Sequence, residues 1–529
     1  MPSYPSVRFF PVLLMIFLLA ALMTVAGCTS SPVSSSESSS FGDNITAITE
    51  APWYTHASWG IIIVDPTTGK TLYERNADQM FVPGSTTKLF SSAALLNALG
   101  PDYRFSTPVY AMGSVDDNGK LDGNLVLVAS GDPNMGGRTL PDNTIAYTNI
   151  DHGDANALGG AILAPTDPLA GLDDLALQVK ASGILEVSDV VIDDRLFETT
   201  DLGKLYVISP ISINDDQIDI TITPTGPGAA PSLAMRPQTA AYRLVNKVTT
   251  GPAGNPLEIS VTEEPKGTIV VQGTIAADAG SVNQTYPIKT PAAFARTLFI
   301  EALDRQGVRV TAAATGDNPS AMLPARTVYS GARMVAELTS PPLSDEVRLT
   351  LKVSQNLHAD TYVSLLAASS GRTGFYDGMQ EEGKILKTLG LDTQGVSLGD
   401  GEGGASEDRI SPRSAAGLLT LMAKRPYAAK YENALPILGV DGSLATSCTP
   451  GSPACGHVYA KTGTTGTYDP LNDRGLLVAK SLAGYVDTSH GQRLAFAIYV
   501  NNVPFENIDD MMASGNDLGR IAEAIYTYY

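Results

Sequence analysis

Ser85 and Lys88 stand three residues apart in the stretch FVPGSTTKLFSSAALLNALG, residues 81–100. The apolar residues that follow have helical spacing, so the stretch predicts an amphipathic helix beginning near the serine. Residues three apart on a helix share a face, which brings the Lys88 amine within reach of the Ser85 hydroxyl. A desolvated neutral amine there could take the hydroxyl proton, as nucleophilic catalysis by serine requires. The simpler alternative is that Ser85 caps the helix and Lys88 is solvated.

A second pattern, AKTGTTG, places Lys461, Thr462 and Gly463 directly before Thr464. At a strand edge, a lysine and hydroxyl groups offer a charge-assisted site for a substrate carboxylate, and a glycine lets the substrate approach the backbone closely. A strand is predicted here because two apolar runs joined by a polar turn follow the pattern. The alternative is an exposed basic turn.

Ser-x-Asn triplets begin at Ser212, Ser281 and Ser354. The first two lie in segments that are typical of strands and turns. The third, Ser354 with Asn356, precedes a segment whose apolar residues have helical spacing. We therefore choose Ser354 and Asn356 as the candidate site residues.

Ser-x-x-Lys, Ser-x-Asn and Lys-Thr-Gly in this order form the signature of penicillin-binding proteins and serine β-lactamases. With the first two motifs so far apart, the chain resembles the low-molecular-mass class C penicillin-binding proteins, the D-alanyl-D-alanine carboxypeptidase and endopeptidase family. Stretches similar to that family occur across most of the mature chain. Three departures stand out: Pro-Gly-Ser at 83–85 where the family has Pro-Ala-Ser, DGEGGAS at 400–406 where it tends to have Asp-Gly-Ser-Gly-Leu-Ser, and a longer segment after Lys-Thr-Gly.

The resemblance implies an α+β fold, in which a five-stranded antiparallel sheet between helix layers forms a catalytic domain of the penicillin-binding-protein and β-lactamase type. It also implies that a long, strand-rich insert of two nested domains interrupts the catalytic domain. The predicted segments are a signal peptide (1–27), a lipid-anchored flexible tether (28–44), the first part of the catalytic domain (45–107), the inserted domains (108–332, with an inner unit at 136–222) and the second part of the catalytic domain (333–529).

The same resemblance implies roles for the site residues. These are Ser85 as nucleophile, Lys88 as its base, Ser354 as proton relay to the leaving amine, Asn356 as a holder of the substrate amide or of Lys88, and Lys461, Thr462, Gly463 and Thr464 as the site for the terminal carboxylate. The N–H groups of Ser85 and Thr464 would form the oxyanion hole.

The implied substrates are peptidoglycan stem peptides ending in D-Ala-D-Ala, the implied inhibitors are β-lactams, and no cofactor is required. Two alternatives remain open. One is a β-lactamase or esterase on the same fold, which would lose its acyl group rapidly. The other is a non-catalytic envelope-binding lipoprotein that keeps the fold.

Length and composition limit the class of protein. A chain of 529 residues with 43% hydrophobic residues predicts two or three domains with sizeable cores. The net charge of −20 opposes binding to nucleic acid through a general electrostatic field, and we find no basic run to offset it. Nucleic acid is therefore not expected as a partner.

The N-terminus predicts export. Arg8 precedes a long apolar run that ends in VAGC, with Cys28 as its last residue. This resembles the lipobox of bacterial lipoproteins, in which the signal is removed and the new N-terminal cysteine carries lipid. A plain cleaved signal and an uncleaved anchor are the alternatives. The polar, low-complexity stretch that follows suits a tether, so we expect a chain attached by lipid in the cell envelope, at the outer face of the cytoplasmic membrane or in the periplasm.

The two remaining cysteines, Cys448 and Cys455, flank a short Pro/Gly turn. An exported protein lives where disulfides persist, so we expect the two to be bridged. Metal ligation is the alternative, but there is no second cysteine pair and the five histidines are scattered. We therefore expect no metal site.

Overall fold

The computed structural model describes residues 40–265 and 267–529. The predicted signal peptide and Cys28 lie outside this part of the chain. Within it, none of the helices is both long enough and apolar enough to span a membrane.

The end of the predicted tether is corrected by the structure. Residues 41–44 belong to helix α1 (Phe41–Thr49), which Ser40 caps by accepting a hydrogen bond from the N–H of Asp43. Phe41 and Ile45 are buried on this helix. The helix begins where apolar residues start to recur at helical spacing.

The central sheet has five strands in an antiparallel arrangement, which confirms the predicted fold class. Its two edge strands differ in length, and the strand that carries the Lys-Thr-Gly pattern lies at one edge. In spatial order the strands are β17 (Val458–Asp469), β18 (Arg474–Asp487), β19 (Arg493–Phe505), β1 (Ser58–Val64) and β2 (Thr71–Arg75).

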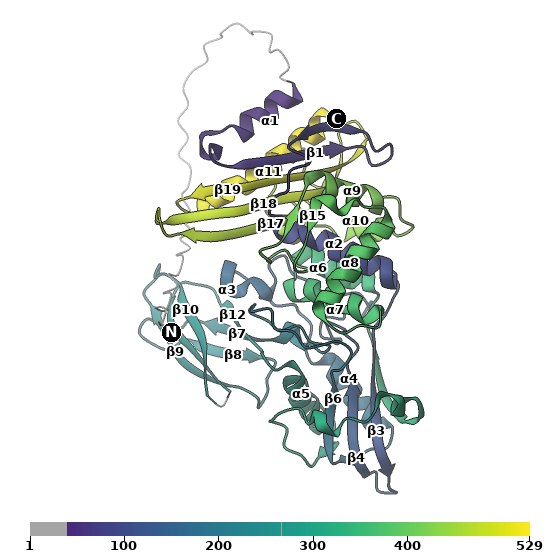
Figure 1. Ribbon diagram of the computed structural model, residues 1–529. Coiled ribbons are helices and arrows are strands. Elements are labelled where there is room, and N and C mark those ends of the chain that lie inside the picture. The colour runs from purple at the N-terminus through teal and green to yellow at the C-terminus, as the bar shows by residue number, and fades with distance from the viewer. Residues whose placement is uncertain (1–39, 266) are drawn as a thin grey trace, which may run out of the picture.

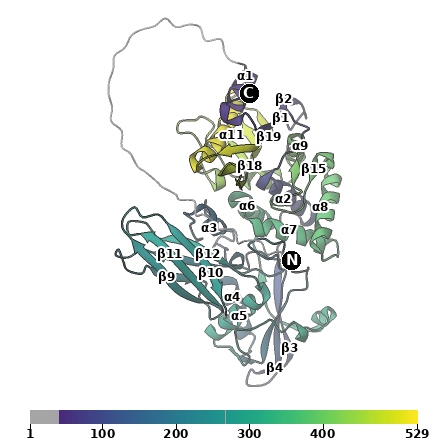
Figure 2. The ribbon, with the colours of Figure 1, turned by 60° about the vertical axis from the view of Figure 1, so that its left-hand side comes forward.

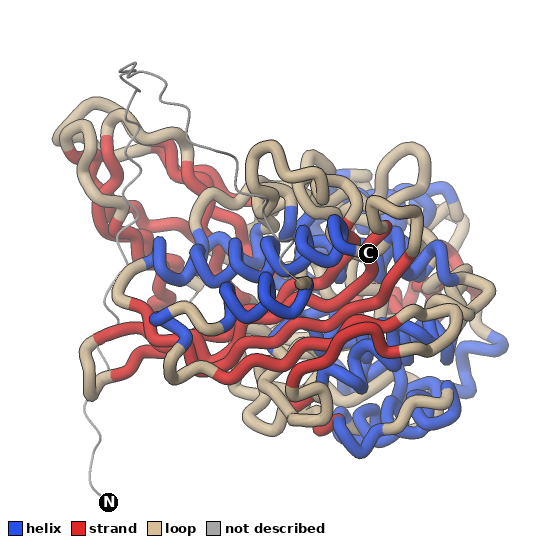
Figure 3. The backbone as a smooth tube through the Cα atoms, turned by 90° about the horizontal axis from the view of Figure 1, so that it is seen from above, coloured by secondary structure: helices blue, strands red, loops and turns tan. Residues whose placement is uncertain are grey.

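Helices cover both faces of this sheet. Helix α11 (Ile508–Tyr528) lies across the strands on one face, with α1 packed beside it (Figures 1 and 3). The other face packs against α9 (Pro412–Met422). Ile61 on β1 joins the core under α11, whereas Ile62 joins the core on the opposite side. A strand covered on both faces must be apolar at successive positions, as the run Ile-Ile-Ile-Val in β1 is.

The core of the helical layer beside the sheet is built around helix α2 (Lys88–Leu99), which is buried on almost every side by neighbouring helices. These neighbours are α6 (Leu343–Val353), α7 (Asn356–Ser369) and α8 (Phe375–Leu389). Because α2 and the start of α7 meet here, residues far apart in the sequence are brought to one place.

The inserted segment forms the lower part of the molecule in Figure 1. One sheet has the order β14 (Arg333–Thr339), β3 (Ser106–Val115), β4 (Leu121–Val128) and β6 (Asp189–Asp193). Since β14 pairs with β3, residues 333–339 belong to this sheet and not to the second part of the catalytic domain, as the boundary at 333 had placed them.

The predicted inner unit at 136–222 is also corrected. The parallel pairing of β6 with β4 ties part of that range to the outer sheet. Strand β7 (Gln217–Thr223) instead pairs with β12 (Val282–Pro287), in a separate strand-rich lobe of the insert. Figure 2 shows this lobe at the left, apart from the end formed by β3 and β4; it also contains β8 (Ser232–Arg236), β9 (Arg243–Gly251), β10 (Glu258–Glu264) and β11 (Thr268–Ala276).

Cys448 and Cys455 are joined by a disulfide in the loop before β17. The bridge closes a short turn beside Gly439, whose backbone has a φ of +72°. It therefore braces the loop that leads into the strand carrying Lys461.

Candidate active site

Ser85 lies in a 3-10 turn, η2 (Gly84–Thr87), and Lys88 is the first residue of α2. The Lys88 amine lies 2.9 Å from Ser85 Oγ, and it donates hydrogen bonds to Asn356 Oδ1 over 2.7 Å and to the carbonyl oxygen of Glu402 over 2.9 Å. At the N-caps of both η2 and α2 the structure describes no side-chain cap. The Ser85 hydroxyl thus faces the lysine and does not cap the helix.

The environment of Lys88 favours a neutral amine. Its side chain is fully buried, and this burial lowers the pKa of Lys88 below its usual value. The carboxylates of Glu402, Asp360 and Asp400 oppose the shift, while the Lys204 ammonium adds to it. A buried lysine with a lowered pKa, hydrogen-bonded to a serine hydroxyl, can act as a general base.

A second serine and lysine pair lies beside the first. Ser354 sits between α6 and α7 in a left-handed conformation with φ 65°, which is uncommon for a residue other than glycine. Its Oγ accepts a hydrogen bond of 2.9 Å from the amine of Lys461 on β17. Burial lowers the pKa of Lys461 well below its usual range, and the neighbouring Lys88 lowers it further. The structure therefore brings together Ser354, Asn356 and Lys461 around the amine and hydroxyl of the first pair.

The Ser-x-Asn triplets beginning at Ser212 and Ser281 lie elsewhere. Ser281 Oγ lies 2.8 Å from Thr223 Oγ1, and Asn283 on β12 accepts a hydrogen bond from Thr221. These residues belong to the inserted lobe. The triplet beginning at Ser212 also lies in the insert, just before β7.

Close backbone packing aligns the Ser85 turn with β17. A Cβ atom on Gly463 would lie 2.4 Å from the carbonyl oxygen of Pro83 and 3.0 Å from the amide nitrogen of Ser85. A Cβ atom on Gly84 would lie 3.0 Å from the amide nitrogen of Thr464. Only glycines permit this approach, which places the Ser85 and Thr464 amides on either side of the same junction.

The hydroxyls of the Lys-Thr-Gly strand have defined partners. Thr462 Oγ1 lies 2.8 Å from Ser443 Oγ, and the exposed Thr464 accepts a hydrogen bond of 2.8 Å from the Lys480 amine. Burial lowers the pKa of Lys480 to about 8. Sequence reasoning missed Lys480. The signal was present in the hairpin register, because Lys480 on β18 pairs directly with Thr464 on β17.

The DGEGGAS loop packs on the turn that carries Ser85. Asp400 Oδ1 accepts hydrogen bonds from the N–H groups of Glu402 and Gly403 over 3.1 and 2.7 Å. A Cβ atom on Gly403 would lie only 2.0 Å from the carbonyl oxygen of Gly84. Glu402, which sequence reasoning did not select, thereby comes within 3.8 Å of the Lys88 amine. The departure from the family pattern at this position was the signal that could have found it.

A cavity of about 300 Å³ opens beside the two pairs. The catalytic domain contributes one side of it and the inserted segment the other. Its lining includes Ser354, Asn356 and Glu402 from the catalytic domain and Asp154, Asn156, Lys204, Tyr206 and Gln217 from the insert.

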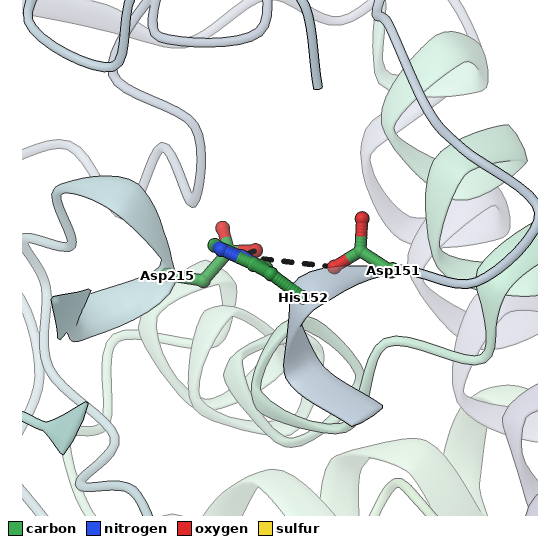
Figure 4. A group of neighbouring side chains, drawn as sticks. All are labelled: Asp151, His152 and Asp215. Atoms are coloured by element: carbon green, nitrogen blue, oxygen red, sulfur yellow. Dashed lines mark hydrogen bonds and ion pairs between the residues drawn. The ribbon is translucent and has the colours of Figure 1, made fainter. Parts of the chain in front are cut away.

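A buried ion network joins the insert to the Ser-x-Asn segment. Asp151, His152 and Asp215 have ligand atoms within 4.8 Å of one another (Figure 4), a spacing that could hold a metal ion. One nitrogen of Arg138, Nη2, already lies 3.0 Å from Asp151 Oδ1, 3.0 Å from His152 Nε2 and 2.6 Å from Asp215 Oδ2. The guanidinium occupies the position between these groups, and we interpret the cluster as structural.

Asp215 connects this network to the active site. Its Oδ2 accepts a hydrogen bond of 3.0 Å from Gln355, the residue between Ser354 and Asn356. Gln355 in turn accepts a hydrogen bond from the N–H of Leu357 and so caps α7. The insert therefore holds the middle residue of the triplet.

The chain is similar to known proteins over most of its length. A D-alanyl-D-alanine carboxypeptidase from Actinomadura sp. (strain R39) is 29% identical over 486 residues, which cover 87% of this chain and 80% of that protein. The crystal structure of penicillin-binding protein 4 (dacB) from Haemophilus influenzae has a TM-score of 0.70 at 20% identity, covering 92% of this chain and all of that one. The same protein complexed with a novel β-lactam gives a TM-score of 0.67 over the same shares of both chains. These two structures support the fold.

The family description "D-Ala-D-Ala carboxypeptidase 3 (S13) family" matches residues 42–518. This match spans both parts of the catalytic domain and the insert between them. The family predicted from the three motifs is thereby confirmed: the chain belongs to the D-Ala-D-Ala carboxypeptidase 3 (S13) family and is a hydrolase.

Proposed function

We propose that the protein is a serine D-Ala-D-Ala carboxypeptidase or endopeptidase that acts on peptidoglycan stem peptides through an acyl-enzyme on Ser85. The observation that carries this proposal is the contact between the buried Lys88 amine and Ser85 Oγ at 2.9 Å, beside a second serine and lysine pair. The Actinomadura relative, named a D-alanyl-D-alanine carboxypeptidase, supports the substrate class.

In the acylation step, Ser85 Oγ attacks the carbonyl carbon of the D-Ala-D-Ala peptide bond and the neutral Lys88 amine takes the hydroxyl proton. The carbonyl oxygen gains negative charge, which the N–H groups of Ser85 and Thr464 stabilise. The C–N bond then breaks, and the departing D-Ala amine receives a proton through Ser354. Asn356 accepts a hydrogen bond from Lys88 and keeps that amine pointed at Ser85.

In the deacylation step, a water molecule attacks the ester carbon and loses a proton to Lys88. The ester bond breaks, Ser85 recovers its proton, and the shortened peptide leaves as a carboxylic acid. No atoms beyond those of peptide and water are needed.

The terminal carboxylate of the substrate would bind at Lys461, Thr462 and Thr464. Binding of an anion restores the charged form of Lys461, whose pKa burial lowers in the free enzyme. A charge-assisted hydrogen bond then fixes the end of the peptide relative to Ser85.

We also propose that β-lactams acylate Ser85, since the Haemophilus structure with a bound β-lactam has the same fold. Export with a lipid anchor at Cys28 remains part of the proposal, and replacing Cys28 by Ser should abolish incorporation of radiolabelled palmitate. The anchored enzyme would then act on peptidoglycan from the membrane surface.

The first test is mass spectrometry of the full-length chain, purified in detergent, after incubation with benzylpenicillin. A stable adduct on the Ser85 peptide, absent in Ser85→Ala, would support the proposal. Rapid loss of the adduct with turnover of the drug would favour a β-lactamase. An unmodified chain that also leaves D-Ala-D-Ala peptides intact would favour a non-catalytic binding protein.

A further inference from the structure

A chain of charged side chains runs from the inserted segment to the base Lys88. Lys204 lies in the insert, in the loop between β6 and β7. Its amine is 2.6 Å from Asp360 Oδ2, 2.8 Å from Asp400 Oδ2 and 3.0 Å from Glu402 Oε1. The other oxygen of Glu402, Oε2, is 3.8 Å from the Lys88 amine. One carboxylate thus bridges a lysine of the insert and a lysine of the catalytic domain.

The three carboxylates need the cation that Lys204 provides. The side chains of Asp360 and Asp400 are 0% and 1% exposed, and ionised carboxylates at such positions are costly without a charged partner. Burial alone would lower the pKa of Lys204, but Asp360, Glu402 and Asp400 raise it above its usual range. Lys204 therefore remains charged and compensates the carboxylates around it.

The charges have opposite effects on Lys88. The Glu402 carboxylate favours the ammonium form of Lys88, and the Lys204 ammonium disfavours it. Two other titratable groups face Lys88 from different elements: Lys461 on β17, and Asp154 at the end of the 3-10 turn η3 (His152–Asp154) in the insert. Neither contacts Lys204 in the hydrogen bonds and ion pairs of the described residues, so changes at Lys204 and Glu402 act on Lys88 separately from them.

We propose that Lys204 is a positioning residue of the insert which, by holding and compensating Glu402, sets the protonation state of Lys88 and hence the pH at which Ser85 is acylated. This inference rests on the proposed roles of Ser85 and Lys88. It gives the insert a part in catalysis: the catalytic domain places a glutamate beside its base, and the insert supplies the cation that balances it.

The experiment is the pH dependence, from pH 5 to 10, of the second-order rate constant for acylation of the full-length protein by benzylpenicillin. Acylation needs neutral Lys88, so the acidic limb of this profile reports the pKa of that amine. Lys204→Met leaves Glu402 uncompensated and moves the limb to higher pH by about one unit or more. Glu402→Gln removes the carboxylate that favours the ammonium form and moves the limb to lower pH, by about one unit.

Lys204→Arg keeps the charge, so the midpoint of its acidic limb should lie close to that of the wild type. Lys180→Met removes an exposed lysine from α4 (Ala170–Ala181) of the same insert and serves as the matched control, with an unmoved limb. Opposite shifts in Lys204→Met and Glu402→Gln are the expected result, because loss of packing alone would lower the rate in both variants without moving their midpoints in opposite directions.

Shifts in the same direction, or slower acylation with unmoved midpoints, would overturn the inference. If Lys204→Met does not fold, Glu402→Gln still tests it, since an unmoved limb in that variant contradicts the bridge. A wild-type protein that is not acylated at any pH would refute the proposed function itself, and the two failures are therefore distinguishable.

Discussion

Lys461 donates a hydrogen bond from Nζ to the Oγ atom of Ser354 over 2.9 Å, although 107 positions separate the two residues in the chain. The lysine comes from the edge strand of the sheet and the serine from the junction of two helices. The contact crosses the boundary between the sheet and the helical layer.

The Ser354 and Lys461 pair should behave as one unit. Ser354→Ala and Lys461→Met are each expected to lower kcat/KM for a synthetic acyl-D-Ala-D-Ala peptide by about 10²–10⁴, the range of a lost proton-transfer group. The double variant should lose little more than the worse single variant, because either change breaks the same hydrogen bond. A double-mutant cycle measures this, and fully additive losses would show that the residues act independently.

Lys88 should set the pH at which the enzyme is acylated. Its amine is active when neutral, that is, above its pKa, and burial lowers that pKa below the usual 10.5. Acylation by benzylpenicillin is therefore expected to rise with pH and to reach half its maximum below pH 10.5. In Lys88→Arg the guanidinium stays charged, so acylation should fall by about 10²–10⁴ and show no recovery with rising pH. Recovery of the arginine variant at high pH would exclude Lys88 as the base.

Gly463 should be irreplaceable for activity. In Gly463→Ala the new Cβ would meet Ser481 Oγ at 2.2 Å and the Pro83 carbonyl oxygen at 2.4 Å, so the Ser85 turn must move away from β17. We expect a loss of at least about 10²-fold in acylation, because misplacement of reacting groups by about 1 Å has that effect. Gly466→Ala is the matched control on the same strand, where the nearest atom to the new Cβ is 3.9 Å away. Equal activity of both variants would contradict the packing argument.

Asp215 should be essential for stability. Asp215→Asn removes the carboxylate shared by Arg138, His152 and His358 and leaves buried positive charges uncompensated. Breaking a buried ion pair of this kind costs about 3–5 kcal/mol in the free energy of unfolding. Denaturant titration measures the loss, and Asp117→Asn, at an exposed turn position of the insert, should change stability by less than about 0.5 kcal/mol. An equally small effect of Asp215→Asn would show that the network contributes nothing to the free energy of unfolding.

The same network predicts how stability depends on pH. Burial alone would lower the pKa of His152, but Asp219 and Asp151 raise it to about 10 in the folded protein, compared with about 6.5 in an unfolded chain. The folded state therefore binds the additional proton, so the resulting stabilisation is fully present below pH 6.5 and disappears as the pH rises through 10. In His152→Gln, the free energy of unfolding measured over pH 6–10 should fall less with rising pH than in the wild type, because this component is missing.

The sequence determined those parts of the site that depend on local spacing. Ser85 and Lys88 meet because three residues span one turn of helix, and the order of the three motifs was sufficient to predict the family and the fold class. The apolar run of β1 likewise predicts a strand buried on both faces. Each motif, and the strand, is encoded within a few consecutive residues.

Tertiary structure decided which distant charges surround the candidate site. Lys204, Glu402 and Lys480 lie in loops or on strands whose neighbours follow from pairing and packing over long distances, and an isolated lysine or glutamate has no periodic pattern to reveal its partner. The nested units of the insert were mispredicted for the same reason, because the parallel pair of β4 and β6 joins segments separated by about sixty residues. The partners of a buried charge are chosen by the whole fold, since only there does exclusion of water make an unpaired charge costly.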